Sequence, residues 1–99
     1  MVSLQNIIGF DWDEGNNRKN DKHNVSMSEA EEVFFNAPLL VIEDAKHSHQ
    51  ESRLHALGKT DSGRFLLITF TLRQTGQLIR IISARDMHRK ERVIYDKAG

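Results

Sequence analysis

Arginine side chains near the C-terminal end of the sequence are the residues best suited to bind an anion. Arg80 interrupts the otherwise apolar run 78–84, which is typical of a strand. A charge inside such a run is costly unless it is paired or lies at the rim of the sheet. One interpretation is an anion-binding arginine on a rigid strand, where the guanidinium can match the geometry of a phosphate. The other is a snorkelling or salt-bridged arginine without a ligand.

The segment after this run predicts a final helix from about Asp86 to Lys97, with an arginine at its entry. Spacings of three, four and three place basic, imidazole and phenol side chains on one face of that helix. These residues are Arg85, His88, Arg92 and Tyr95, with Arg89 at the edge of the face. Arginine binds phosphate, and histidine and tyrosine can transfer protons, so this face could take part in phosphoryl chemistry.

Another side of the same helix is apolar and is predicted to pack on a sheet. Met87, Ile94 and Ala98 form it, and Tyr95 lies near its border. The simpler interpretation of the helix is a solvated basic face, on which Tyr95 covers the core and Glu91 pairs with a neighbour. Spacing alone leaves both interpretations open.

Two further groups of histidines could do chemistry elsewhere in the chain. Lys22 and His23 close the polar stretch 13–23, a predicted surface helix, where they either compensate the helix dipole or add a cationic, proton-transferring pair. His47 and His49 lie among acidic residues and could reach one metal ion, but no third fixed ligand is evident, so we expect no metal. The chain has no cysteine for a disulfide or a thiolate site, and no cofactor motif is present.

Length and composition favour one small domain, because 99 residues do not hold two separate cores. No apolar run approaches the ~20 residues of a membrane span, and the N-terminus lacks the pattern of a signal peptide. We therefore expect a cytoplasmic protein without membrane contact. The net charge is zero, but residues 64–99 hold eight Lys/Arg and three Asp/Glu, whereas residues 1–63 hold six and eleven. A neutral total thus hides a possible basic surface.

Periodicity and turn residues predict the elements that position these side chains. Strands are expected at 7–12, 39–42, 53–58, 64–71 and 78–84. Ser26 and Glu29 match a capping box that starts a helix, and Asn36-Ala37-Pro38 ends it.

Two strands have distinctive patterns. In the first, Ile8, Phe10 and Trp12 are expected on one face, whereas the stretch 65–70 is apolar on both faces and predicts the central strand. Short turns at 61–63 and 74–77 favour an antiparallel meander. The order β-α-α-β-β-β-β-α predicts an α+β fold with a mostly antiparallel sheet.

Motifs at both ends of the sequence match the pattern of one family. Those of the first half are the run 10–14 (FDWDE), 22–26 (KHNVS), 29–30, 33–34, 38–39 and 43–44. Those of the second half are Arg53, 57–58 (LG), 80–85 (RIISAR), Arg89, Glu91-Arg92 and Tyr95. Together they resemble the BrnT family of toxins over roughly residues 9–96.

The resemblance implies a RelE-like ribonuclease toxin of a type II toxin–antitoxin pair that inhibits translation. Its partners would be an RNA substrate and a BrnA-like antitoxin with a ribbon-helix-helix domain, and promoter DNA would be bound only through the antitoxin complex. RNA would be cut without a metal or other cofactor, by attack of its own 2′-hydroxyl on the scissile phosphate. The protein would supply positive charge and a proton donor.

The resemblance also implies roles for individual residues. The phosphate clamps would be Arg53, Arg80 and Arg85, with Lys22, Arg89 and Arg92 adding positive charge. His23 or Tyr95 would transfer a proton, and Glu91 would act as a base or orient an arginine. Asp86 and Gly15 depart from the family pattern: the first tempers the charge beside Arg85, and the second weakens the first helix.

Two other functions stay open on the sequence. A non-catalytic RNA- or antitoxin-binding module, acting as a co-repressor, would bind RNA in a salt-sensitive manner and leave it intact. A metal hydrolase that used His47 and His49 would lose its activity on chelation.

Overall fold

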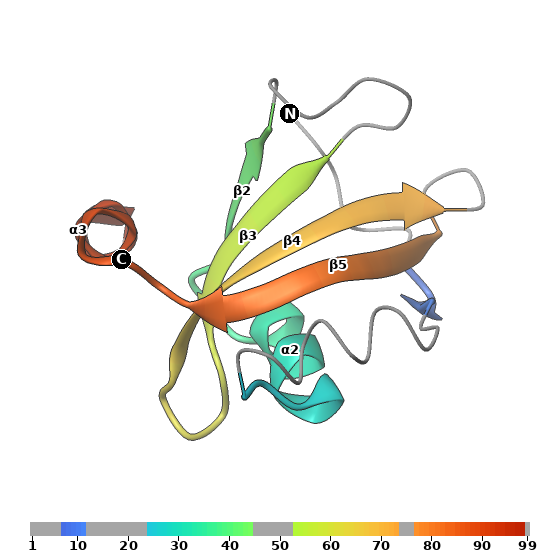
Figure 1. The fold of residues 1–99 in the computed structure, drawn as a ribbon, viewed down its shortest axis with the longest axis horizontal. Helices are drawn as coiled ribbons and strands as arrows, with labels where there is room; N and C mark the ends of the chain where they lie inside the picture. The colour runs from blue at the N-terminus through green and yellow to red at the C-terminus, as the bar shows by residue number, and fades with distance from the viewer. Residues whose placement is uncertain (1–6, 12–23, 45–52, 74–76, 99) are drawn as a thin grey trace.

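A mixed five-stranded sheet forms the centre of the computed structural model, which describes residues 7–11, 24–44, 53–73 and 77–98 (Figure 1). The strands are β1 (Gly9–Phe10), β2 (Leu40–Glu43), β3 (Leu54–Lys59), β4 (Phe65–Arg73) and β5 (Leu78–Asp86), in the spatial order β1-β5-β4-β3-β2. Strands β2 to β5 pair antiparallel in sequence order, and β1 pairs with β5 in parallel. The predicted α+β class and the antiparallel meander are confirmed.

Strand β4 lies in the middle of the sheet, as its two apolar faces predict. Leu66, Ile68 and Phe70 point to one face and belong to the larger core. Leu67 points to the other face and packs in a smaller cluster with Leu57. Burial on both faces explains why this strand lacks the alternating polar pattern of a half-exposed strand.

Helix α2 (Met27–Glu32) covers the larger core and begins at the predicted capping box. The Glu29 N–H donates to Ser26 Oγ at 3.1 Å, and the Ser26 N–H donates to Glu29 Oε1 at 3.1 Å. A 3-10 turn, η1 (Val33–Phe35), continues α2, and Asn36 then adopts an extended conformation that ends it. The local signals at both ends of this helix are therefore confirmed.

The larger core lies between α2, η1 and the sheet. The ring of Phe34 packs edge-on against Phe70 with centroids 5.1 Å apart, and against Phe10 at 5.6 Å. Gly58 of β3 faces η1 so closely that a Cβ there would lie 2.6 Å from Val33 Cγ1. A glycine is therefore required where β3 passes under η1.

The first strand differs from its prediction. It comprises only Gly9 and Phe10, because β1 pairs with the edge of β5 over two residues. Phe10 packs on the core, whereas Ile8 is 74% exposed, so the two do not share a buried face as predicted. The predicted position of Trp12, the predicted helix 13–23 and most of the loop 43–52 lie outside the described residues.

The end of the chain also differs from its prediction. Strand β5 continues through Arg85 and Asp86, which pair with Leu67 and Leu66, and helix α3 (Arg89–Ala98) begins three residues later than expected. Arg85 is therefore a strand residue and not the entry to a helix. Backbone pairing with β4 keeps Arg85 and Asp86 in strand conformation, because β4 still has residues opposite them.

The residues of α3 that pack on the sheet also differ from those predicted. Tyr95 is its buried residue, and Met87 packs from the preceding turn. Ile94 is 50% exposed and Ala98 is exposed, so the prediction that both pack on the sheet is wrong. Figure 1 shows α3 beside the β2–β3 side of the sheet, across the sheet from α2.

Candidate nucleic-acid interface

The face of the sheet opposite α2 is only partly covered. Helix α3 packs on one end of it through Tyr95, which joins Leu57 and Leu67 in a cluster. No helix of the described ranges packs on the rest of this face. The polar and basic side chains on this part of the face lie on rigid strands. They can contact a ligand without any change in the core.

A β-bulge determines which arginines reach this face. Arg80 pairs with Thr71 and Arg85 pairs with Leu67, but the register shifts between them so that Ile82 has no partner on β4. In a regular strand two residues five apart point to opposite faces. The extra residue of the bulge restores the phase, so that Arg80 and Arg85 lie on the same face.

Strand β3 and the residue before it place further basic side chains on the same face. His55 pairs with Thr69 of β4. Thr69 points to the same face as Leu67 and Thr71, because it lies two residues from each of them along the strand. Arg53 lies two residues before His55, so alternation places it on that face as well. We call this surface the arginine face. Its members are Arg53, His55, Thr69, Thr71, Arg73, Arg80, Ser83 and Arg85.

Thr71 offers a free donor on the arginine face. It is 2% exposed, and its hydroxyl has no hydrogen-bond partner among the described residues. Its cross-strand neighbour is Arg80. An unsatisfied buried hydroxyl is unusual, because such a group costs about 1–3 kcal/mol. The unpaired hydroxyl thus lies in the same row as Arg80 and is covered from solvent.

Arg85 is held by a bidentate pair with Glu91 from the first turn of α3. Both guanidinium NH₂ groups donate to the carboxylate at 2.8 Å, and the His88 N–H donates to Glu91 Oε1 at 2.7 Å. These bonds, led by that of Arg85, lower the pKa of Glu91 to about 2. Glu91 is thus ionised and fixed, which suits the orientation of an arginine better than the acceptance of a proton.

Tyr95 lies beneath α3 and away from solvent. Its hydroxyl donates to the carbonyl of Pro38 at 2.8 Å, and its ring packs edge-on against Phe65. Burial raises the pKa of the phenol, and its residue is 4% exposed. The predicted helical face that combined Arg85, Arg92 and Tyr95 is therefore not formed, because these side chains belong to different environments.

Arg89 and Arg92 lie around a shallow hollow of about 440 Å³ between the end of β5 and the start of α3. The Arg92 guanidinium stacks on the Phe65 ring, 3.4 Å from its centroid, and donates to Asp96 at 3.1 Å. Arg89 and His88 are exposed at the rim. The structure thus brings the two arginines predicted to assist RNA binding close together, at the end of the sheet.

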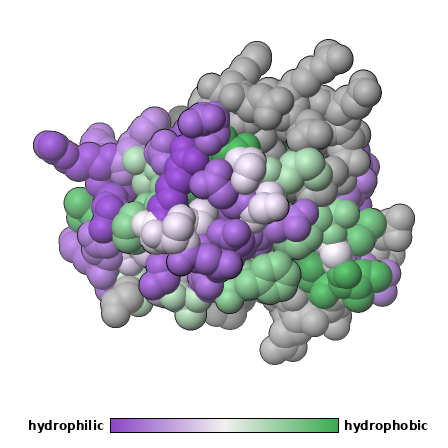
Figure 2. All heavy atoms as spheres, turned by 90° about the horizontal axis from the view of Figure 1, so that it is seen from below, coloured by the Kyte–Doolittle hydropathy of each residue, from purple (hydrophilic) through white to green (hydrophobic). Residues whose placement is uncertain are grey.

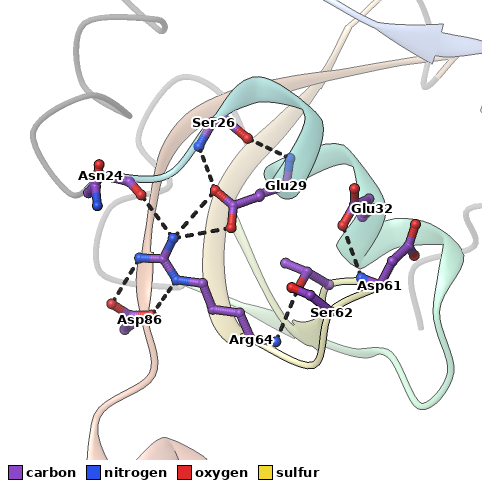
Figure 3. A network of polar contacts seen from close by, with 9 residues as sticks. Asn24, Ser26, Glu29, Glu32, Asp61, Ser62, Arg64 and Asp86 are labelled. Atoms are coloured by element: carbon purple, nitrogen blue, oxygen red, sulfur yellow. Dashed lines mark hydrogen bonds and ion pairs between the residues drawn. The ribbon is translucent and has the colours of Figure 1, made fainter.

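Arg64 shows what a structural arginine looks like in this protein (Figure 3). It donates to both carboxylate oxygens of Asp86 at 2.8 and 3.1 Å, to the Asn24 carbonyl at 2.8 Å and to Glu29. The bonds to Asp86, first among these causes, raise its pKa. The carboxylate of Asp86 therefore faces Arg64, whereas the guanidinium of Arg85 donates to the backbone carbonyl of Asp86.

The molecule also has an apolar surface, at the β1 end. A pocket of about 220 Å³ there is lined by Ile7, Ile8, Gly9, Phe10, Phe34, Phe35 and Ile79. In Figure 2 hydrophobic side chains gather at one end of the view, whereas most of the remaining coloured surface is hydrophilic. Phe35 is 78% exposed in this region.

His55 and Thr71 are among the residues of the arginine face that sequence reasoning missed. The signal for His55 was present, since alternation through the predicted strand 53–58 already placed it beside Arg53. Thr71 stands out only through its burial, which needs the structure. Lys22, His23, His47 and His49 lie outside the described residues, and the described ones contain no group of three potential metal ligands.

These features define a small α+β protein with arginines on the sheet face opposite α2. The family model of BrnT, the ribonuclease toxin of a type II toxin–antitoxin system, matches residues 12–91, and the chain belongs to this family. No curated protein matches the sequence. Membership of a type II toxin family implies an RNA substrate and an antitoxin partner. Within the described parts of the chain, no helix combines the length and the hydrophobicity that crossing a membrane requires.

Proposed function

We propose that this protein is an endoribonuclease toxin that binds RNA on the arginine face and cleaves it without a metal ion. One observation carries the proposal: the bulge at Ile82 turns Arg80 and Arg85 to the face that also bears His55 and Thr71. Arginine forks match the equatorial oxygens of a phosphate. Charge held rigidly at the scissile group stabilises the transition state, where the negative charge on those oxygens grows.

The reaction is a transesterification within the RNA. The 2′-oxygen attacks the adjacent phosphorus, the bond to the 5′-oxygen breaks, and a 2′,3′-cyclic phosphate forms. Arg53, Arg80 and Arg85 are the proposed phosphate clamps, and Glu91 holds the guanidinium of Arg85 in place. Arg89 and Arg92 extend the basic surface along the RNA, and Lys22 is proposed to add positive charge. His23 remains a candidate for proton transfer, whereas the hydrogen bond of Tyr95 to Pro38 argues against the phenol.

The wider assignment follows the family. We infer a RelE-like fold, an antitoxin of the BrnA type with a ribbon-helix-helix domain, and promoter binding only by the complex of toxin and antitoxin. The toxin acts in the cytoplasm, where it stops translation by removing intact RNA.

Cleavage of a synthetic RNA tests this function directly. The purified chain is incubated with labelled RNA in excess EDTA, and the cleaved position is mapped. We expect products with a 2′,3′-cyclic phosphate, and no cleavage when the nucleotide before the scissile bond carries a 2′-deoxy sugar. RNA that is bound but stays intact would show a non-catalytic module, and cleavage that stops in EDTA would show that a metal is needed.

A further inference from the structure

A histidine on the arginine face is held between two polar partners from neighbouring strands. His55 of β3 lies 3.1 Å, through Nε2, from Oδ2 of Asp44, which directly follows β2. Its other ring nitrogen, Nδ1, lies 3.0 Å from the hydroxyl of Thr69 on β4. The imidazole is 28% exposed and the Asp44 side chain is 13% exposed. The ring is thus fixed in direction, and part of it is exposed.

The partners of His55 determine which nitrogen can release a proton. An ionised carboxylate only accepts hydrogen bonds, so Nε2 carries a hydrogen that points to Asp44. The second proton of the charged ring is then on Nδ1, on the side of Thr69. This arrangement resembles a carboxylate–imidazole pair in which the acid sets the tautomer and stabilises the imidazolium. The transferable proton of His55 therefore faces the middle of the sheet.

The position of His55 among the arginines follows from the register. The row His55–Thr69–Ser83 runs across β3, β4 and β5 between the rows that end in Arg85 and in Arg80. Rows on one face are roughly 7 Å apart along the strands, and β3 lies about 10 Å from β5 across them. An extended arginine side chain covers much of that distance. A phosphodiester bound between the Arg80 and Arg85 rows would lie beside the His55 ring.

We propose that His55 is the proton donor to the leaving 5′-oxygen of the cleaved RNA, with Asp44 as the residue that positions its ring. The inference rests on the RNA cleavage proposed above. In the step, the bond from the 2′-oxygen to phosphorus forms and the bond from phosphorus to the 5′-oxygen breaks. The proton on Nδ1 leaves its hydrogen bond to the Thr69 hydroxyl and moves to that oxygen, and the imidazole is then neutral. The 2′-hydroxyl proton passes to solvent, from which the ring is later protonated again.

Two other titratable side chains near the arginine face, Glu91 and Tyr95, fit this role less well. Glu91 is kept ionised by Arg85 and has no proton to give. Tyr95 uses its proton on the Pro38 carbonyl beneath α3. When its ring is protonated, His55 has a proton on Nδ1 to transfer, and it also has partial exposure and a place between the two arginine rows.

Replacement of the leaving oxygen by sulfur tests the proposal, because a thiolate leaves without protonation. An RNA that the parent cleaves at a mapped position is synthesised with a bridging 5′-sulfur at that bond. We expect His55→Gln to cleave the ordinary RNA ~100-fold or more slowly than the parent, which is the usual scale of general acid catalysis. On the sulfur RNA the same variant should cleave within ~10-fold of the parent. Asp44→Asn should show a smaller loss with the same rescue.

Arg80→Ala is the contrasting variant, since an arginine that stabilises charge on phosphate is not replaced by a better leaving group. It should be slow on both RNAs. Thermal unfolding and the affinity for a 2′-deoxy-substituted RNA show whether each variant folds and binds. If the parent cleaves RNA and His55→Gln cleaves it within ~3-fold, or is slow on both substrates, this inference is overturned while the proposed function stands. If the parent leaves RNA intact, the proposed function fails first.

Discussion

Two arginines show how similar ion pairs can have different consequences. Arg64 joins Asp86, Glu29 and the Asn24 carbonyl on the α2 side of the sheet, so its guanidinium is occupied by structural contacts. Arg85 also has a carboxylate partner, Glu91, but lies on the arginine face. There the pair fixes the direction of a guanidinium and reduces its net charge. The residue type alone therefore does not distinguish a structural arginine from one that can bind a ligand. The face of the sheet on which the arginine lies must also be known.

The pair of Arg85 and Glu91 predicts a pH dependence of stability. The pKa of Glu91 is about 2 in the folded chain, against an ordinary value of 4.5. A lowered pKa stabilises the fold above pH 4.5, and this contribution is lost as the pH falls towards 2. It is on the order of 2 kcal/mol at neutral pH, and Glu91→Gln should remove it.

Urea unfolding at pH 7 and at pH 3 measures this effect. The parent should lose more free energy of unfolding between the two pH values than Glu91→Gln does. Asp96→Asn is the control, because its pair with Arg92 is exposed on α3 and should be worth less than about 0.5 kcal/mol. Equal losses in the parent and in Glu91→Gln would contradict the prediction.

At the scale of elements, the features that depend on local sequence were predictable. The capping box of Ser26 and Glu29 begins α2, and the two apolar faces of 65–70 identify the central strand. The bulge at Ile82 was not predictable, because it depends on pairing with β4 and leaves no mark in the order of apolar residues. The later start of α3 has the same origin, since the ladder with β4 extends β5 through Asp86. The arginines of the candidate site were therefore predicted from the sequence, whereas their arrangement in space was not.

The close approach of β3 to η1 gives a prediction at this scale. Gly58→Ala places a Cβ 2.6 Å from Val33 Cγ1 and 3.3 Å from the Val33 carbonyl, so the strand or the turn must move. Overpacking of this kind costs about 1–3 kcal/mol of unfolding free energy. Gly9→Ala is the matched control, because its Cβ would meet Leu78 at an ordinary 3.6 Å. Chemical denaturation should show a clearly larger loss for Gly58→Ala, and equal losses would refute the packing argument.

At the scale of the whole molecule, Arg64 connects segments that lie far apart in the sequence. Asn24 precedes α2 and Glu29 lies in its first turn, whereas Asp86 ends β5, and all three meet at one guanidinium (Figure 3). A second contact, from the Asp61 N–H to Glu32 at 2.9 Å, ties α2 to the turn between β3 and β4. These contacts lie across the sheet from the arginine face, so scaffold and proposed site use different arginines.

This division predicts a separation of stability from RNA binding. Arg64→Met should lower the unfolding free energy by about 1–3 kcal/mol, because it removes the hydrogen bonds to Asp86, Glu29 and the Asn24 carbonyl. Its affinity for RNA at a temperature where it is folded should stay within ~3-fold of the parent. Thermal unfolding and filter binding check the two parts, with the exposed Lys90→Met as a control for lost charge. An Arg64→Met variant that was as stable as the parent but had lost RNA binding would show that Arg64 binds RNA and is not a structural residue.

The central claim is that RNA is cut on the arginine face, and the cleavage rate of Arg80→Ala tests it most directly. Lys97→Ala, which removes the same charge from the exposed end of α3, is the matched control. With both variants shown to be folded, Arg80→Ala should cleave RNA ~100-fold or more slowly than the parent, as the loss of one donor to a transition-state oxyanion does elsewhere. Lys97→Ala should stay within ~3-fold. An Arg80→Ala protein that cleaved RNA as fast as Lys97→Ala would contradict the account.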